Sequence, residues 1–108
     1  VWGSGTPKRE FLYIDDLADA CVYLIKHYSD SQTINIGTGE DISISGLATL
    51  IANVIQYPGD FIYDTTMPDG TPRKQLDVSR LETLGWKAKI DLPTGIKLTY
   101  QDFLERSV

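Results

Sequence analysis

The alternation of two kinds of apolar pattern constrains the fold of this chain more than any other feature of its sequence. Apolar stripes at helical spacing follow Asp15, Ser43 and Asp91, and a side-chain oxygen at each of these positions can cap a helix. Short strand-like runs lie before and between the helices, at Arg9–Ile14, Thr33–Ile36 and Phe61–Tyr63. Because strands alternate with helices, the sequence predicts a small α/β or α+β unit with few short strands and three to four helices.

Turn residues set the remaining boundaries. Pro58-Gly59 is expected to end the second helix, residues 65–74 form a polar loop, and Gly85 closes a brief helix that Asp77 begins. Two or three short strands make a thin sheet that depends on packing against another domain. The chain also starts at Val1 without Met, as if inside a strand, so we expect a fragment with apolar surface exposed where a partner domain would pack.

Composition bounds the class of protein. The 108 residues fit one domain, and 42% hydrophobic with 23% charged residues is ordinary for a globular chain. The net charge of −5 argues against nucleic acid as a partner, because phosphate-backbone binding needs clustered cations. No apolar run reaches the roughly 20 residues that span a membrane. The single Cys21 excludes an internal disulfide and predicts a reducing, cytoplasmic location.

The sequence offers no catalytic residue and no metal site. None of the six Tyr is followed four residues later by Lys, the pair that a short-chain dehydrogenase uses for proton transfer. Gly37-Thr38-Gly39 follows a predicted strand, but a dinucleotide fingerprint needs a third Gly where Ile42 stands, so we interpret it as a turn. Asp15 and Asp16 are interpreted as helix-capping and dipole-complementing residues, and Cys21 as a buried thiol.

Two segments carry a family resemblance. Residues 1–18, VWGSGTPKREFLYIDDLA, resemble the opening of the substrate domain of extended short-chain dehydrogenases. Residues 68–77, PDGTPRKQLD, followed by Leu84-Gly85-Trp86, look like the GDP-L-fucose synthase family specifically. That family comprises NADP-dependent epimerase-reductases that convert GDP-4-dehydro-6-deoxy-D-mannose to GDP-L-fucose.

The resemblance implies how the chain divides and what it lacks. Residues 1–108 would form the carboxy-terminal nucleotide-sugar-binding domain of a homodimeric enzyme. The Rossmann domain with its NADP site, and the catalytic Ser, Tyr and Lys, would lie upstream of Val1. The fragment alone is therefore expected to be inactive and to bind no cofactor.

The resemblance also implies four substrate-binding residues. Arg9 suits a diphosphate, because a planar guanidinium binds two oxygens at once, although from the residues alone it can equally pair with Glu10 or Asp15. Lys74 would add a second positive charge, with Arg73 as the alternative ligand. Both cations are expected to converge on one anionic ligand in the folded chain.

Trp2 and Asp69 would hold the nucleoside. The alternative for Trp2 is plain core packing, and the alternative for Asp69 is a turn residue before Gly70. Trp86, which follows Gly85, is predicted to lie in the core. Two rival functions remain at this point: the substrate domain of another nucleotide-sugar epimerase or dehydratase, and a non-catalytic interaction module.

Overall fold

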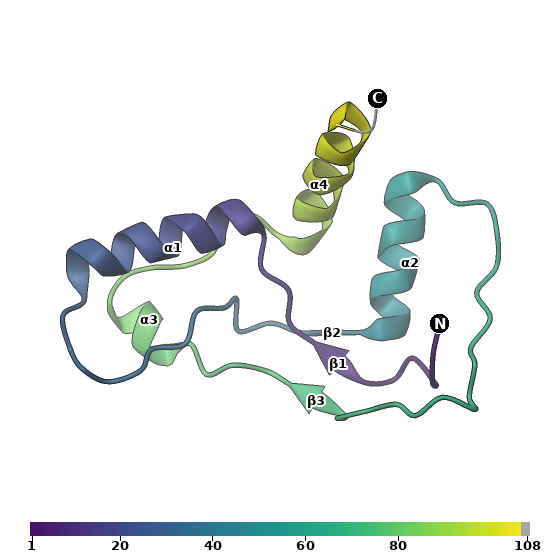
Figure 1. Ribbon diagram of the computed structural model, residues 1–108, viewed down its shortest axis with the longest axis horizontal. Coiled ribbons are helices and arrows are strands. Elements are labelled where there is room, and N and C mark those ends of the chain that lie inside the picture. Colours follow the sequence, from purple (N-terminus) through teal and green to yellow (C-terminus); the bar gives the residue numbers. More distant parts are fainter. Residues whose placement is uncertain (107–108) are drawn as a thin grey trace.

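A small mixed sheet occupies the middle of the chain, with helices at either end of it. The computed structural model describes residues 1–106, which form four helices and three strands (Figure 1). The strands are β1 (Lys8–Arg9), β2 (Ile42–Ser43) and β3 (Arg73–Lys74), in the order β2-β1-β3. Strand β1 pairs antiparallel with β2 and parallel with β3. The predicted α/β class is confirmed.

The strand boundaries were predicted less well than the fold class. The run Arg9–Ile14 is a strand only at Arg9, since β1 ends there and a helix begins at Ile14. Thr33–Ile36 forms no strand; Ile34 and Ile36 are partly buried, and they pack on the core without pairing with another strand. Phe61–Tyr63 is likewise irregular.

The amino terminus runs beside that third segment. Trp2 forms an isolated parallel bridge with Asp64, and the Gly3 amide donates to the Asp64 carbonyl at 2.8 Å. The amino group of Val1 donates to the Ile62 carbonyl at 2.8 Å. The first residues are therefore fixed to the segment that leads into the 65–74 loop.

Helix α1 (Ile14–His27) starts two residues earlier than its capping prediction requires. Its N-cap is Tyr13, which makes no side-chain capping bond, so the prediction that Asp15 caps the helix is wrong. Asp16 is buried at 4% exposure, and its Oδ2 accepts hydrogen bonds from the amides of Lys89 and Ile90 at 3.1 and 2.9 Å. This carboxylate ties α1 to the chain that enters the last helix.

The cap of the second helix follows the sequence. Ser43 caps α2 (Ile44–Ile55), because its hydroxyl accepts from the Gly46 amide at 3.0 Å. This helix ends at Gln56, which adopts a left-handed φ of 57°, two residues before the predicted Pro58-Gly59 stop.

The last two helices differ in this respect. The N-cap of the short α3 (Ser79–Thr83) is Val78, which makes no side-chain capping bond, so the prediction that Asp77 caps this helix is wrong; Asp77 lies one residue earlier and accepts from the Ser79 amide at 3.0 Å. Asp91 accepts from the Thr94 amide at 2.9 Å at the start of α4 (Leu92–Arg106).

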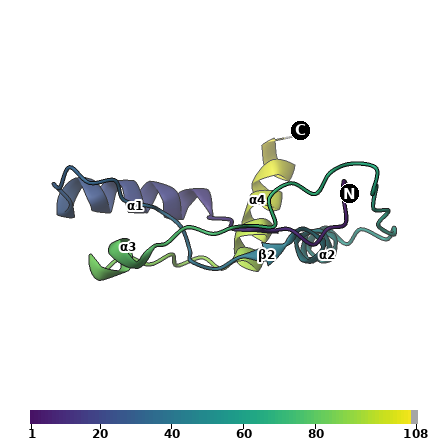
Figure 2. The ribbon, with the colours of Figure 1, turned by 90° about the horizontal axis from the view of Figure 1, so that it is seen from below.

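The buried core is small and lies between α1 and α3. Ala20, Leu81 and Trp86 form it, and the Trp86 indole donates to Asp19 Oδ2 at 2.9 Å, so the predicted core position of Trp86 is confirmed. Seen edge on, the molecule is flat, with extents of 48 × 36 × 18 Å (Figure 2).

The opposite face of α1 is apolar and exposed. Ile25 is 83% exposed, and further side chains on this helix share that exposure: Ile14, Leu17, Cys21 and Val22. The expected exposed apolar surface is therefore present, while the prediction of a buried Cys21 is wrong because its helix face has no covering layer. No helix within residues 1–106 has the length and apolarity needed to cross a bilayer.

Candidate functional site

Two cations that are distant in sequence lie opposite each other in the sheet. In the parallel pair of β1 and β3, Arg9 is in register with Lys74, and Lys8 with Arg73. Residues in register point to the same side of a sheet. Arg9 and Lys74 accordingly line one cavity of about 540 Å³, together with Leu12, Ile36 and Gln75. The predicted convergence is present; the role of these residues in binding substrate stays a prediction.

The guanidinium of Arg9 is held in place by only some of its hydrogen-bond donors. Its Nη1 donates to the carbonyls of Lys8 and Thr71, both at 2.7 Å, and neither Glu10 nor Asp15 pairs with it. A guanidinium has five N–H donors, and those on Nε and Nη2 have no recorded partner within residues 1–106. These remaining donors are the ones that can receive an anion.

The structure distinguishes the two neighbouring candidates for the second cation. Arg73 binds the carboxylate of Asp41 through two nitrogens, with Nε at 2.6 Å from Oδ2 and Nη2 at 3.3 Å from Oδ1. For the Lys74 ammonium, neither an ion pair nor a hydrogen bond is recorded in the described part of the chain. Arg73 is therefore committed to a structural pair, and Lys74 is the cation that remains available.

Glu10, which the sequence analysis did not single out, holds the turn at residues 37–39. Its Oε1 accepts from the amides of Thr38 at 2.7 Å and Gly39 at 3.3 Å, and its Oε2 accepts from the Leu76 amide at 3.2 Å. The carboxylate lies so close to Gly37 that a Cβ there would collide with it. The glycine-rich turn thus binds an anion of its own chain, which agrees with its interpretation as a turn.

Asp69 fastens the turn that follows Trp2. Its two carboxylate oxygens accept from the backbone amide and the hydroxyl of Ser4, at 2.6 and 2.8 Å. The Ser4 amide, and after it the Ser4 hydroxyl, lowers the pKa of this carboxyl below its usual value of 3.8. Asp69 therefore has a structural role at Ser4, whereas residues 68–70 are irregular and do not confirm the interpretation of Asp69 as a turn residue before Gly70.

Trp2 is 73% exposed, so its core-packing alternative is wrong. It lies at the same end of the sheet as Asp69, because Gly3 packs directly against the Asp69 carboxylate. Gly70 in turn approaches the Arg9 guanidinium, since a Cβ built there would be 3.6 Å from Nη2. The four predicted residues therefore lie on the amino-terminal segment, β1, β3 and the chain that leads into β3, and these segments contact one another.

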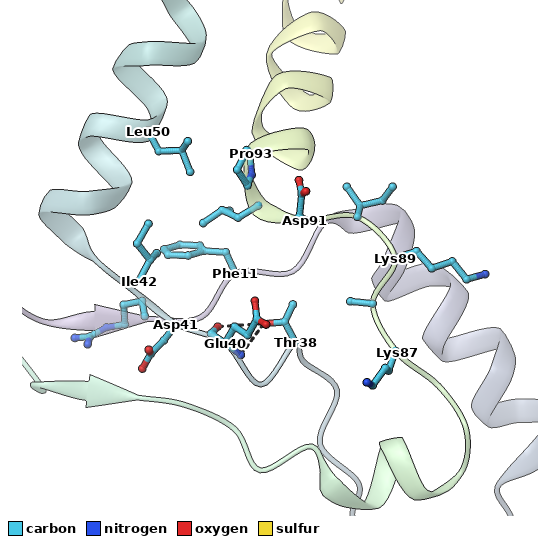
Figure 3. A pocket seen from close by; sticks show the side chains of 14 residues that line it. Phe11, Thr38, Glu40, Asp41, Ile42, Leu50, Lys87, Lys89, Asp91 and Pro93 are labelled. Carbon is cyan, nitrogen blue, oxygen red and sulfur yellow. Dashed lines mark hydrogen bonds between the residues drawn. The ribbon is translucent and has the colours of Figure 1, made fainter.

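A second cavity of about 510 Å³, which Arg9 also lines, lies between α2 and the start of α4 (Figure 3). Apolar side chains gather in it, among them Phe11, Ile42, Leu50 and Pro93, with Asp41 and Asp91 at its border. Of the residues that line it, sequence reasoning named only Arg9 as a site residue, because the walls come from four separate segments. In the described part of the chain, no group of three or more His, Cys, Asp or Glu side chains could hold a metal ion.

Comparison with known proteins agrees with the resemblance in both segments. Residues 1–37 match the NAD dependent epimerase/dehydratase family. The whole chain is 51% identical over 108 residues to a putative GDP-L-fucose synthase 2 of Arabidopsis thaliana, and it covers 33% of that protein. The chain is homologous to the carboxy-terminal third of GDP-L-fucose synthases.

Solved structures extend this homology to the fold. A GDP-L-fucose synthetase from Naegleria fowleri, solved with NADP bound, superposes with a TM-score of 0.93 at 29% identity, over 99% of this chain and 34% of that one. A UDP-glucose 4-epimerase from Thermotoga maritima superposes with a TM-score of 0.90 at 27% identity, over 100% of this chain and 35% of that one. The fold is thus shared by proteins with different nucleotides, and the chain spans about a third of the length of the GDP-L-fucose synthases it matches.

Proposed function

We propose that this chain is the nucleotide-sugar-binding part of an NADP-dependent GDP-L-fucose synthase, the epimerase-reductase that converts GDP-4-dehydro-6-deoxy-D-mannose to GDP-L-fucose. The observation that carries the proposal is the register of Arg9 with Lys74 beside one cavity. Two positive charges from separate strands match the charge of a diphosphate, and one of them is a guanidinium that can bind two oxygens.

In this proposal the four residues contact two parts of the ligand, the diphosphate and the nucleoside. Arg9 binds the diphosphate through its Nε and Nη2 donors, while Lys74 contributes a mobile point charge. Trp2 offers an exposed aromatic face to the nucleoside. Asp69 accepts from the nucleoside hydroxyls or the base, because each carboxylate oxygen can accept a further bond beyond the one from Ser4.

The residues of this chain do not fit a dinucleotide cofactor. The amides of the glycine-rich turn at residues 37–39 already hold the Glu10 carboxylate, which would repel a phosphate. We therefore assign NADP, the hydride it supplies and the proton-transferring residues to a Rossmann domain outside this chain. The exposed stripe of α1 is the surface we assign to that domain. A homodimeric, cytoplasmic parent enzyme completes the proposal, and residues 1–108 alone are expected to be inactive.

Calorimetric titration of the full-length protein with GDP tests the proposal. Loss of charge-assisted hydrogen bonds makes the Arg9→Ala variant bind GDP about 10- to 100-fold more weakly. Lys8→Ala is the matched control, because Lys8 lies next to Arg9 in β1 but is in register with Arg73 and points to the other face. Equal affinity of wild type and Arg9→Ala would remove Arg9 from the site.

A second experiment addresses the base, since the fold is shared with a UDP-glucose 4-epimerase. Thermal unfolding is followed with GDP, UDP and dTDP at the same concentration, and the proposal predicts the largest stabilisation with GDP. A clear preference for UDP or dTDP would assign the chain to another nucleotide-sugar epimerase or dehydratase. Absence of any shift together with reversible self-association would favour the interaction module.

A further inference from the structure

Glu10 occupies a position that joins three separate segments at the candidate site. It follows Arg9 directly, and its carboxylate reaches both the turn at residues 37–39 and the Leu76 amide, two residues after Lys74. Glu10 also lines the cavity that Arg9 and Lys74 share. A single side chain, attached next to Arg9, therefore joins that strand to the 37–39 turn and to the backbone two residues after Lys74.

The strands that carry the cations need such a tie. Strands β1 and β3 are each two residues long, and a strand pair of that length has little stability of its own. The amide of Lys8 donates to the Pro72 carbonyl at 2.9 Å at one end of the pair. At the other end the Leu76 amide donates to the Glu10 carboxylate. Arg9 and Lys74 therefore lie between two hydrogen bonds that join the same two segments.

The negative charge of Glu10 is unfavourable beside a phosphate site, so Glu10 must have another role there. A carboxylate beside a diphosphate repels it, so a residue selected for charge alone would not be acidic here. Three backbone amides donate to this carboxylate, so its role is to hold segments of the chain together rather than to supply a charge to the site. We propose that Glu10 is a positioning residue that holds Arg9 and Lys74 in the spacing needed for the phosphates; this inference rests on the function proposed above.

The Glu10→Gln variant separates positioning from charge, because the two roles predict opposite signs. Gln keeps the size of Glu, but its NH₂ group cannot accept from a backbone amide, so one end of the tie is lost. Positioning predicts that GDP binds about tenfold more weakly to this variant in the full-length protein, the effect of one lost charge-assisted bond. Unchanged or tighter binding, as expected from removing a negative charge, would overturn the inference.

Glu40→Gln is the matched control for charge. Glu40 follows the same turn and is exposed, and its side chain has no recorded hydrogen bond within residues 1–106. Its replacement should leave the GDP dissociation constant within about twofold, because it makes no contact that positions a cation.

Gly37→Ala tests the same idea without changing any charge. The added methyl would collide with Glu10 Oε1, which is the end of a flexible side chain and can swing away at low cost to the fold. We expect this variant to weaken GDP binding as Glu10→Gln does, and the double variant to bind no worse than either. Normal GDP binding by Gly37→Ala would mean that GDP binding does not need the Glu10 carboxylate to be bound to the 37–39 turn.

A double-mutant cycle with Lys74→Ala distinguishes positioning from a general structural effect. If Glu10 acts through the cations, Glu10→Gln costs clearly less affinity in the Lys74→Ala background than in wild type, whereas independent effects multiply. Circular dichroism at the titration temperature verifies that each variant is folded. If neither Arg9→Ala nor Lys74→Ala alters GDP binding, the proposed function fails; if they do and the cycle shows no coupling, only the role of Glu10 fails.

Discussion

At the residue scale, Arg73 and Lys74 illustrate how side-chain direction separates two similar neighbours. Consecutive residues of a strand point to opposite faces, so only one of them can share a face with Arg9. Arg73 faces Asp41, whose side chain is only 7% exposed, and forms a two-point ion pair with it. Lys74 faces the cavity. The sequence left both open because either cation, taken alone, can bind a phosphate.

This difference predicts distinct outcomes for the two alanine variants. Lys74→Ala should weaken GDP binding about tenfold and leave the unfolding free energy unchanged, because its ammonium has no structural partner. Arg73→Ala should bind GDP within about threefold of wild type but lose about 1 kcal/mol of stability, since the half-exposed pair is partly screened. Calorimetry and urea denaturation measure the two quantities. The reverse pattern would make Arg73 the phosphate ligand.

Asp15 and Asp16 form a second contrasting pair. Asp16→Ala removes the acceptor for two backbone amides in a buried place and should lower the unfolding free energy by about 2 kcal/mol. Asp15→Ala, one residue away on the exposed side, should cost about 0.5 kcal/mol through the helix dipole alone. Chemical denaturation of both variants in the same buffer checks the difference, and equal losses would show that the buried contact contributes nothing specific.

Carboxylates were the residues whose roles the sequence predicted least well. Asp16, Glu10 and Asp69 each accept backbone amides from a segment far along the chain. No local pattern encodes such partners, because they meet only after folding. Arg9, Lys74, Trp2 and Asp69 were found through a resemblance, whereas Glu10 lay beside Arg9 without a signal of its own.

At the element scale, the sequence predicted elements that depend on local interactions better than elements that depend on distant partners. The caps Ser43 and Asp91 each bind an amide three residues ahead, so the sequence alone fixes them. Strands need partners from elsewhere, and the predicted strands were accordingly too long or absent. Thr33–Ile36 is the clearest case, since its apolar side chains pack on the core without a neighbouring strand.

Two aspartates next to the starts of α3 and α4 make the stability of the fold decrease at acidic pH. Hydrogen bonds from the Thr94 side chain and amide lower the pKa of Asp91, and those from the Ser79 amide and side chain lower that of Asp77, below the usual 3.8. A carboxyl whose folded pKa is depressed contributes stability that is complete above its unfolded pKa and is lost as pH falls through the folded one. The melting temperature should therefore decrease as pH falls below 3.8.

Asp91→Asn provides the control for this loss of stability at acidic pH. Asn caps a helix about as well as Asp but does not titrate, so the variant should keep its α4 cap and lose less stability between neutral and acidic pH than wild type. Thermal scans of both proteins across this range measure the slope. An identical slope in the variant would mean that Asp91 does not contribute to the acid response.

At the scale of the whole molecule, the chain is more open than its length requires. Its radius of gyration is 16.5 Å, against about 13 Å for a compact domain of this size. Its exposed surface is 7760 Å², against about 6,000 Å² for a monomer of this mass. Helix α1 contributes to the excess because it is apolar on two faces and only one is covered, by α3 and the residues around Trp86 (Figures 1 and 2).

An uncovered apolar stripe predicts association when residues 1–108 are produced alone. Ile25 lies on this stripe at 83% exposure, so Ile25→Lys should shift sedimentation toward monomer at the same concentration. Ile62→Lys is a closely matched control, because Ile62 is 82% exposed but lies in the irregular segment after α2 rather than on an apolar helix face.

The paired variants distinguish a specific surface from general hydrophobicity, since they carry the same substitution at equal exposure. Association that falls only with Ile25→Lys, while the helix content measured by circular dichroism is unchanged, assigns the contact to α1. Association that falls equally with both variants would show that any exposed apolar residue is sufficient. A monomeric wild-type chain at all concentrations would show that the stripe has no tendency to be covered, and it would remove the physical reason for placing a partner domain on α1.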